Sequence, residues 1–171
     1  MKAFFIGILL SSTILYSQSA PSLKKLFKEA FGQEVSIGQK QIHLTASEKK
    51  ALEKEAKTKI DSSNIRFYVI QKGKNIEGYG VLLIQRIRTK KAVILYLIDK
   101  EIKLKNIEIL AFHEPSEYKP YPKWKEAFVG KGIEDKLKTG YAIPNISGAT
   151  LSARAITNAS RIALSIVRKE R

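Results

Sequence analysis

The sequence predicts an α+β protein in which an antiparallel sheet of about four strands is combined with N-terminal helices and a long C-terminal helix. Apolar residues recur with helical period near residues 23–31 and again near residues 151–166. The residues between these segments are rich in β-branched and aromatic side chains that alternate with polar ones. The links between these middle segments are short and polar. Such links favour antiparallel pairing, because a parallel crossover needs roughly a dozen residues or more.

Residues 1–20 have the pattern of a secretory signal peptide. A positively charged start precedes an almost continuous apolar run over Ala3–Ile14, and small and polar residues follow it. This run is about a dozen residues long, which is shorter than the ~20 residues of a membrane-spanning helix. We therefore expect cleavage after Ser19 or Ala20 and a mature protein in the periplasm or another extracytoplasmic compartment.

The next segment, residues 21–62, is predicted to be mainly helical. Thr45 and Glu48 have the spacing of a capping box, which predicts a charged helix that runs to about Ile60. Residues 33–44, before this helix, are expected to be loop or extended chain. The segment opens with five apolar residues that share one helical face: Leu23, Leu26, Phe27, Ala30 and Phe31.

Residues 63–171 form the second predicted unit, which begins with the sheet. Four segments rich in Val, Ile, Leu and Tyr follow one another, separated by short polar turns. They are the segment around Phe67 and Val69, residues 78–87, residues 92–98, and the segment through Ile107 and Ile109 to Phe112.

The remainder of this unit is loop followed by helix. Residues 113–122 carry three of the five prolines, which predicts a loop, and residues 123–129 are expected to form one or two helical turns. Residues 130–146 are expected to be irregular. The long C-terminal helix is predicted from an apolar stripe of Leu151, Ala155, Ala159, Ile162, Ala163 and Ile166.

Composition excludes several kinds of redox and metal site. The chain has no cysteine, so disulfides, thiolate metal sites, cysteine-bound iron–sulfur clusters and a cysteine nucleophile are all absent. The formal net charge is +15, and removal of residues 1–20, which contain one lysine, lowers it to +14. Because an exported protein rarely meets nucleic acid, we expect this charge to favour an anionic membrane surface or an acidic partner protein.

The segment Ser147-Gly148-Ala149-Thr150 directly precedes the C-terminal helix and has the composition of a phosphate site. Small residues let a ligand approach the backbone, and the first turn of a helix offers unpaired N–H groups with a partial positive charge. Ser147 and Thr150 add hydroxyl groups that can bind a phosphate or form an ester with it. The alternative from spacing alone is that Ser147 is an ordinary N-cap and Gly148 a turn residue.

The run PNISGATLSARAI resembles the Ser/Thr-Gly-Ala-Thr signature of FMN-binding domain proteins, which include FMN-carrying subunits of the Rnf and sodium-pumping NADH:quinone oxidoreductase complexes. The resemblance covers roughly residues 64–171 and includes the segments EGY, LAFHEP, and Trp124 with the following FVGK. It implies that a separate flavin transferase attaches FMN to Thr150 through a phosphoester. It also implies that Ser147, Gly148 and Ala149 shape the turn that presents this residue.

The resemblance further implies two more cofactor-binding residues, Glu114 and Trp124. Glu114 stands at the matching family glutamate, where it either forms a hydrogen bond near the flavin or braces its loop. Trp124, with Tyr118 and Tyr121, either stacks on the flavin ring or anchors the core or the loop. His113 is interpreted as a surface residue at a strand end, with a contact to a flavin edge as the alternative.

These expectations combine into an exported flavoprotein electron carrier that passes electrons between a membrane-associated redox complex and another carrier, such as an acidic electron-transfer protein. One position departs from the family pattern: Pro144 stands where many flavinylated members have Asp. Noncovalent FMN therefore stays open. So does a flavin-free module that docks through its basic residues, with Arg86, Arg88, Lys90 and Lys91 as candidates. A soluble flavin reductase is the third hypothesis, and no metal or nucleic acid is expected.

Overall fold

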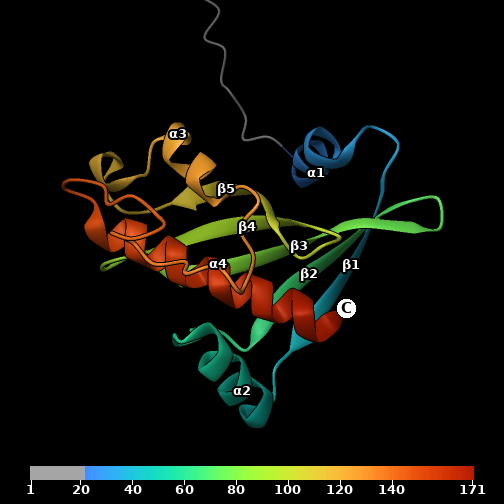
Figure 1. Ribbon diagram of the computed structural model, residues 1–171, viewed down its shortest axis with the longest axis horizontal. Coiled ribbons are helices and arrows are strands. Elements are labelled where there is room, and N and C mark those ends of the chain that lie inside the picture. The colour runs from blue at the N-terminus through green and yellow to red at the C-terminus, as the bar shows by residue number, and fades with distance from the viewer. Residues whose placement is uncertain (1–21) are drawn as a thin grey trace, which may run out of the picture.

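The computed structural model describes residues 22–171, so the predicted signal peptide lies outside the described residues. Across this described part, no helix is both long enough and apolar enough to cross a membrane. The chain forms helix α1, strand β1, helix α2, four further strands and then the C-terminal elements (Figure 1). The bounds are α1 Leu23–Phe31, β1 Ser36–His43, α2 Ala46–Ala56, β2 Asn64–Lys72, β3 Asn75–Arg86, β4 Lys91–Asp99, β5 Leu104–Phe112, α3 Pro122–Lys125 and α4 Thr150–Glu170, with 3₁₀ turns at Ser116–Tyr118 and Glu126–Phe128.

The five strands form one antiparallel sheet in the order β1-β2-β3-β4-β5, so each strand pairs only with its neighbours along the chain. The predicted α+β class is confirmed, with five strands in place of about four. The additional strand is β1, in the stretch expected to be loop or extended chain. It lies at the edge of the sheet and most of its residues are exposed, which explains why it lacks the alternating apolar pattern of a half-buried strand.

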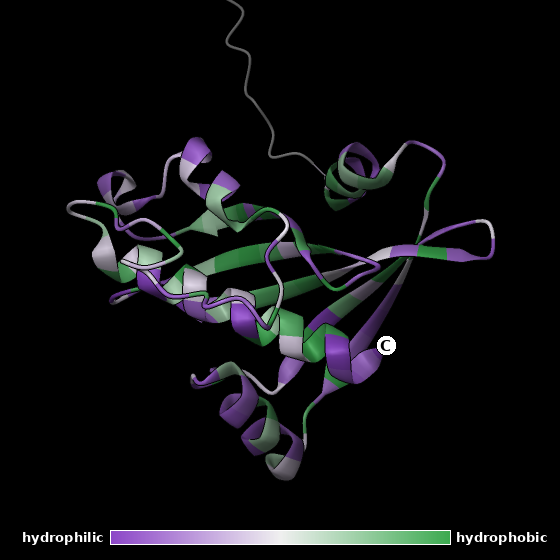
Figure 2. Cartoon of the chain, in the orientation of Figure 1, coloured by the Kyte–Doolittle hydropathy of each residue, from purple (hydrophilic) through white to green (hydrophobic). Residues whose placement is uncertain are grey.

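The sheet buries both faces, and the two faces carry separate cores. The larger core lies between the sheet and the helices α2 and α4, while α1 covers the opposite face with Leu26 and Phe27 (Figure 1). The central strands are strongly apolar, whereas α2 is mostly hydrophilic (Figure 2). Strands buried on both sides read as continuous apolar runs, as in VILYLI of β4.

Close approach of α1 to the sheet depends on a glycine in β3. A Cβ atom placed on Gly80 would lie 2.6 Å from the ring of Phe27. Phe27 is completely buried, and its ring centroid lies 5.0 Å from that of Tyr68. Gly80 therefore allows the close packing of α1 against β3.

The capping box predicted at the start of α2 is confirmed. The Thr45 backbone N–H donates to the Glu48 carboxylate at 2.9 Å, and the Glu48 backbone N–H donates to Thr45 Oγ1 at 3.3 Å. The helix is shorter than expected, because Lys57 adopts the left-handed conformation with φ of 51° and ends it at Ala56. This end leaves α2 as a short helix beside the C-terminal half of α4, where Ala56 contacts Arg161 and Glu48 contacts Lys169.

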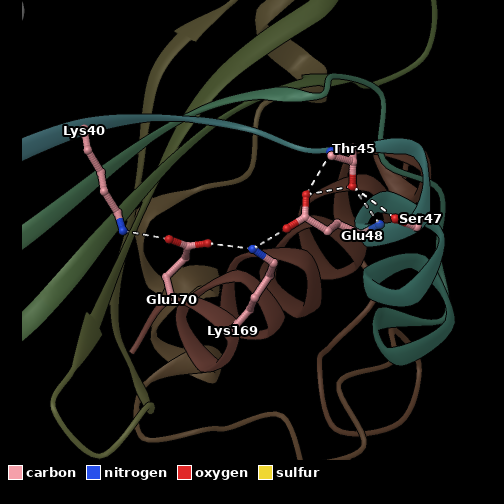
Figure 3. Close-up of polar contacts among 6 residues, drawn as sticks. All are labelled: Lys40, Thr45, Ser47, Glu48, Lys169 and Glu170. Carbon is pink, nitrogen blue, oxygen red and sulfur yellow. Dashed lines mark hydrogen bonds and ion pairs between the residues drawn. The ribbon is translucent and has the colours of Figure 1, made fainter.

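Helix α4 is fixed to the rest of the molecule at its centre and at its C-terminal end. The buried Tyr96 hydroxyl of β4 donates to the Ile156 carbonyl at 3.1 Å. At the C-terminal end, Glu170 pairs with Lys40 of β1 at 2.6 Å, and Lys169 pairs with Glu48 of α2 at 2.9 Å (Figure 3). The position and direction of α4 across the sheet are therefore set by both polar and apolar contacts.

Candidate cofactor site at the start of the C-terminal helix

The start of α4 lacks a side-chain cap of the kind found at α1 and α2. Gly148 has a φ of 76°, and Ala149 occupies the N-cap position, where it has no side chain able to accept a hydrogen bond. Ser147 does not cap the helix, so the alternative of an ordinary serine N-cap is wrong. The first N–H groups of a helix have no partner inside the helix. At α4 they are left available to an external acceptor with negative charge.

The four residues of the SGAT segment divide into one anchor and three accessible positions. Ala149 is buried, Ser147 and Gly148 are exposed, and Thr150 is half-buried. Thr150 Oγ1 donates to the Ile146 carbonyl at 3.5 Å, which is long for a hydrogen bond between oxygens. The Thr150 hydroxyl is thus only weakly held by the protein and is free to turn toward a ligand.

Open space surrounds the turn before α4. A Cβ atom placed on Gly148 would meet no heavy atom within 4 Å. The positive φ of Gly148 still favours glycine, because a side chain disfavours the left-handed conformation. The backbone conformation therefore requires glycine here, while the surroundings leave room for a group that approaches from solvent.

Trp124 anchors the segment that leads to this turn. Its indole N–H donates to the Pro144 carbonyl at 2.8 Å, and its ring meets Phe128 edge-on with centroids 5.0 Å apart. The side chain is only 2% exposed. This geometry matches the anchoring alternative for Trp124 and leaves no face of its ring open for stacking. It also makes Pro144 a fixed point three residues before Ser147.

Glu114 braces the hairpin between β3 and β4. Its Oε1 atom accepts hydrogen bonds from the backbone N–H groups of Arg88, Thr89 and Lys90 at 3.0, 2.6 and 2.8 Å. The Lys90 N–H, and after it those of Thr89 and Arg88, lower the pKa of the Glu114 carboxyl below its ordinary value. The geometry corresponds to the bracing alternative. The carboxylate adds to the backbone hydrogen bond that closes the turn, from the Ile87 N–H to the Lys90 carbonyl at 3.0 Å.

The aromatic and histidine candidates of the loop after β5 are at least partly exposed. The guanidinium of Arg88 lies over the Tyr118 ring, 4.2 Å from its centroid. Tyr121 is 52% exposed, and His113 is exposed at the end of the strand. The side-chain hydrogen bond of Thr150 goes to the Ile146 carbonyl and not to any of these residues. Among residues 22–171 no group of three His, Asp or Glu side chains is placed to hold a metal ion.

The structure also contains a large cavity that the sequence does not predict. Its volume is about 850 Å³, within the range of small-molecule sites. Its walls come from the loop 133–141, from the end of α2 at Glu55 and Lys57, and from α4 at Arg154, Asn158 and Arg161. The signal available in the sequence is the spacing of Arg154, four residues after Thr150, which places both on one helix face.

Residues 89–165 match the family model of the FMN-binding domain. The chain carries an FMN-binding domain. The matched segment starts in the β3–β4 hairpin, ends within α4, and contains the SGAT turn, Glu114, Trp124 and most of the cavity wall. No curated protein matched the chain closely enough to be reported as a relative.

The geometry of this FMN-binding domain fits its cofactor. A phosphate group suits the uncapped start of α4, and the weakly held Thr150 hydroxyl lies in the first turn of that helix. The neighbouring cavity has the volume that a ring system of drug-like size needs. The finer resemblance to the Rnf and sodium-pumping oxidoreductase subunits stays a prediction.

Proposed function

We propose that the protein is an exported electron carrier whose FMN is bound through a phosphoester to Thr150. The observation that supports this proposal is the start of α4, where no side chain caps the helix and the Thr150 hydroxyl has only a 3.5 Å hydrogen bond to the backbone. A phosphate at this position completes the hydrogen bonding of the helix and interacts favourably with its dipole.

Each residue of the turn has a distinct role in this proposal. Thr150 supplies the oxygen that becomes bonded to the FMN phosphorus, while the pyrophosphate bond of FAD breaks, AMP leaves and the hydroxyl proton is released. Gly148 provides the backbone conformation, and Ala149 fastens the turn to the core. The Trp124–Pro144 hydrogen bond fixes the incoming segment and so limits the movement of Thr150. When bound, FMN supplies one- and two-electron redox chemistry, whereas the protein supplies position and electrostatics.

A covalent bond suits a carrier that works outside the cytoplasm. An exported protein has no supply of free FMN to refill an empty site, so a tethered cofactor is not lost by dilution. Export follows from the predicted signal peptide at residues 1–20. The donor we propose is a membrane-associated redox complex, the acceptor is another carrier such as an acidic electron-transfer protein, and maturation requires a flavin transferase.

The attachment is tested by producing the mature chain, from Pro21, together with a flavin transferase and FAD. We expect a fluorescent protein band on a denaturing gel and a mass increase equal to one FMN minus water. Thr150→Ala is expected to lose both signals. Ser147→Ala, which removes the neighbouring exposed hydroxyl, is the matched control and is expected to keep them.

The outcomes separate the alternatives. Fluorescence that persists in Thr150→Ala and disappears in Ser147→Ala would mean that Ser147 carries the ester, which contradicts attachment at Thr150. FMN that binds the folded protein and is released on denaturation removes only the covalent step. A folded protein that neither becomes modified nor retains added FMN removes the carrier function altogether.

Export is tested separately by expressing the full chain and fractionating the cells. We expect an extracytoplasmic protein whose N-terminus is Ala20 or Pro21, as determined by mass spectrometry. A protein that stays in the cytoplasm with residues 1–20 intact contradicts the export proposal and leaves the flavin chemistry unaffected.

A docking module without covalent flavin is the second candidate, and the basic β3–β4 hairpin favours it. Arg86, Arg88, Lys90 and Lys91 are all exposed there, and Glu114 holds the tip in one conformation. Cosedimentation with anionic lipid vesicles tests this surface. We expect binding that weakens as salt rises, because mobile ions screen exposed charges over about 10 Å at 0.1 M. Binding that is equal for neutral vesicles contradicts it.

A further inference from the structure

The cavity lies on the same helix face as the proposed attachment point. Thr150, Arg154, Asn158 and Arg161 follow one another at intervals of four, four and three residues, which is the spacing of one face of an α-helix. The last three line the cavity. Arg154 stands one turn beyond Thr150, about 6 Å along the helix axis. A five-carbon chain of the ribityl type covers a similar distance, since each bond adds about 1.5 Å at most.

The acidic residues of the cavity are occupied by partners within the protein. Glu134 pairs with Arg168 at 3.1 Å, and Glu55 pairs with the same guanidinium. Asp135 accepts a hydrogen bond from the Gly132 backbone N–H at 2.7 Å and lies 3.8 Å from Lys103. Their negative charge is therefore largely compensated before any ligand arrives.

The basic residues of the cavity differ in whether they have partners within the protein. Arg161 has such partners, because it donates hydrogen bonds to the Ala56 carbonyl, the Leu137 carbonyl and Asn158 Oδ1. Four other cations line the cavity and form no ion pair with any acid in the described chain: Lys57, Lys136, Lys138 and Arg154. The cavity thus presents an excess of uncompensated positive charge.

Tyr141 gives the cavity an aromatic wall. It is 71% exposed, the highest value among the exposed large hydrophobic side chains of the described residues, and Lys136 Nζ lies 5.5 Å from the centroid of its ring. The loop that carries it is nevertheless well ordered by hydrogen bonds, from Gly140 N–H to the Ile143 carbonyl at 2.8 Å and from Tyr141 N–H to the Lys138 carbonyl at 3.2 Å. An exposed aromatic ring on a fixed loop is suited to stacking on a flat ligand.

We propose that this cavity receives the isoalloxazine ring of the FMN attached at Thr150, with Tyr141 stacked on the ring and Arg154 beside its N1–C2=O edge. The inference rests on the proposed function and places the ring beside Tyr141 and Arg154, and not beside Trp124, Tyr118 or Tyr121, the stacking candidates from the sequence. Arg154 then stabilises the reduced ring, which has gained two electrons and one proton and carries a negative charge near N1. Arg154 is a residue that tunes the reduction potential and is not needed for attachment.

Stacking is tested on the modified protein by its flavin fluorescence, which an adjacent tyrosine ring quenches. We compare Tyr141→Leu, Tyr141→Phe and, as a matched control, Tyr121→Leu, since Tyr121 is also exposed but does not line the cavity. We expect emission from the folded protein to rise about two-fold or more in Tyr141→Leu only, because Phe retains a ring for stacking. Equal emission in all proteins overturns the stacking contact.

The charge contact is tested by titration with dithionite, which supplies the electrons while water supplies the proton, in the presence of a reference dye. In Arg154→Gln we expect the ratio of reduced to oxidised flavin at fixed potential to fall about ten-fold, or ~30 mV for a two-electron couple. Arg66→Gln is the control, because Arg66 is exposed on β2 away from the cavity. A shift no larger than that of the control overturns this contact.

Failure of this inference is distinguishable from failure of the proposed function. Fluorescent gel bands of equal intensity in all these variants show that attachment at Thr150 stands, so unchanged emission and potential then refute only the ring site. Loss of the gel band in the unaltered protein refutes covalent attachment. In that case the same variants are titrated with free FMN, and equal affinities for all of them overturn the ring site as well.

Discussion

The two ends of α4 differ in how far their polar groups are paired within the protein. At the C-terminal end, Lys169 and Glu170 form ion pairs with α2 and β1, and their polar atoms are directed to partners within the protein (Figure 3). At the N-terminal end, no side chain caps the helix and Thr150 has one long hydrogen bond. One end therefore holds the helix in place, and the other is left for a ligand. A polar group that the fold leaves without a close partner is the better indicator of function.

The largest expected effect on stability concerns Trp124, which anchors the segment that leads to the N-terminal end of α4. Trp124→Ala is expected to lower the free energy of unfolding by about 3–5 kcal/mol, because it opens a cavity in the core and leaves the Pro144 carbonyl without its donor. Urea denaturation followed by circular dichroism measures it. Trp124→Phe, which keeps most of the packing, is the control and is expected to cost clearly less. Similar losses in the two variants contradict the packing role of the ring, because both variants lack the indole N–H that donates to Pro144.

A smaller loss is expected at the turn itself. Gly148→Ala places a side chain at a φ of 76°, which costs about 1–2 kcal/mol although no atom obstructs the new Cβ. The same denaturation experiment tests this value. Gly38→Ala is a suitable control, because Gly38 in β1 has an ordinary φ and its Cβ would only touch the Val69 carbonyl at 3.8 Å. A Gly148→Ala protein as stable as the wild type refutes the backbone strain.

The brace of the hairpin is expected to act locally. Glu114→Gln retains the shape of the side chain but removes the charge that accepts three backbone N–H groups. We expect faster amide hydrogen exchange at Arg88, Thr89 and Lys90, measured by NMR, with little change in the centre of the sheet. Glu117→Gln, in the same loop and exposed, is the control. Unchanged exchange at all three amides contradicts the brace.

The smallest effect on stability is expected from Glu48, which pairs with Lys169 at the C-terminal end of α4, and this effect depends on pH. Hydrogen bonds from the Thr45 backbone and from Lys169 lower the pKa of Glu48 to about 2, from 4.5. Because the pKa is lower in the folded state, Glu48 stabilises the fold fully above about pH 4.5, and this contribution is lost as the pH falls toward 2. Glu48→Gln is therefore expected to flatten the decline of melting temperature with acid between pH 5 and 2. A decline as steep as that of the wild type refutes the linkage.

Sequence patterns predicted the elements that bury a regular apolar face. The strands β2 to β5 and the helix α4 were expected because their apolar residues recur with a fixed period. The capping box of α2 was expected because its hydrogen bonds are local. The strand β1 was not identified, because at an edge its side chains face water and only its backbone pairing with β2 defines it.

The candidate site was predicted only in part for a related reason. The SGAT turn is continuous in sequence, so its place before α4 followed from local patterns and from the family resemblance. The cavity is assembled from three separate segments, and Tyr141 lies in a loop whose conformation depends on contacts such as Trp124 with Pro144. Such contacts leave no periodic signal. For Glu114 and Trp124 the sequence left a flavin contact and a bracing or anchoring role open, and only their hydrogen-bond partners in the structure decided between these roles.

The order of the strands has a consequence for how the chain acquires its structure. A meander pairs only neighbouring segments, so the sheet can form early from contacts of short sequence separation. The helix α4 comes last, and its contact between Glu170 and Lys40 joins residues 130 positions apart. Until it docks, the larger apolar face of the sheet is open to water and to other chains. Truncation within the 21 residues of α4 is therefore expected to yield an aggregating protein, and a transferase that requires the folded turn can act only after α4 is in place.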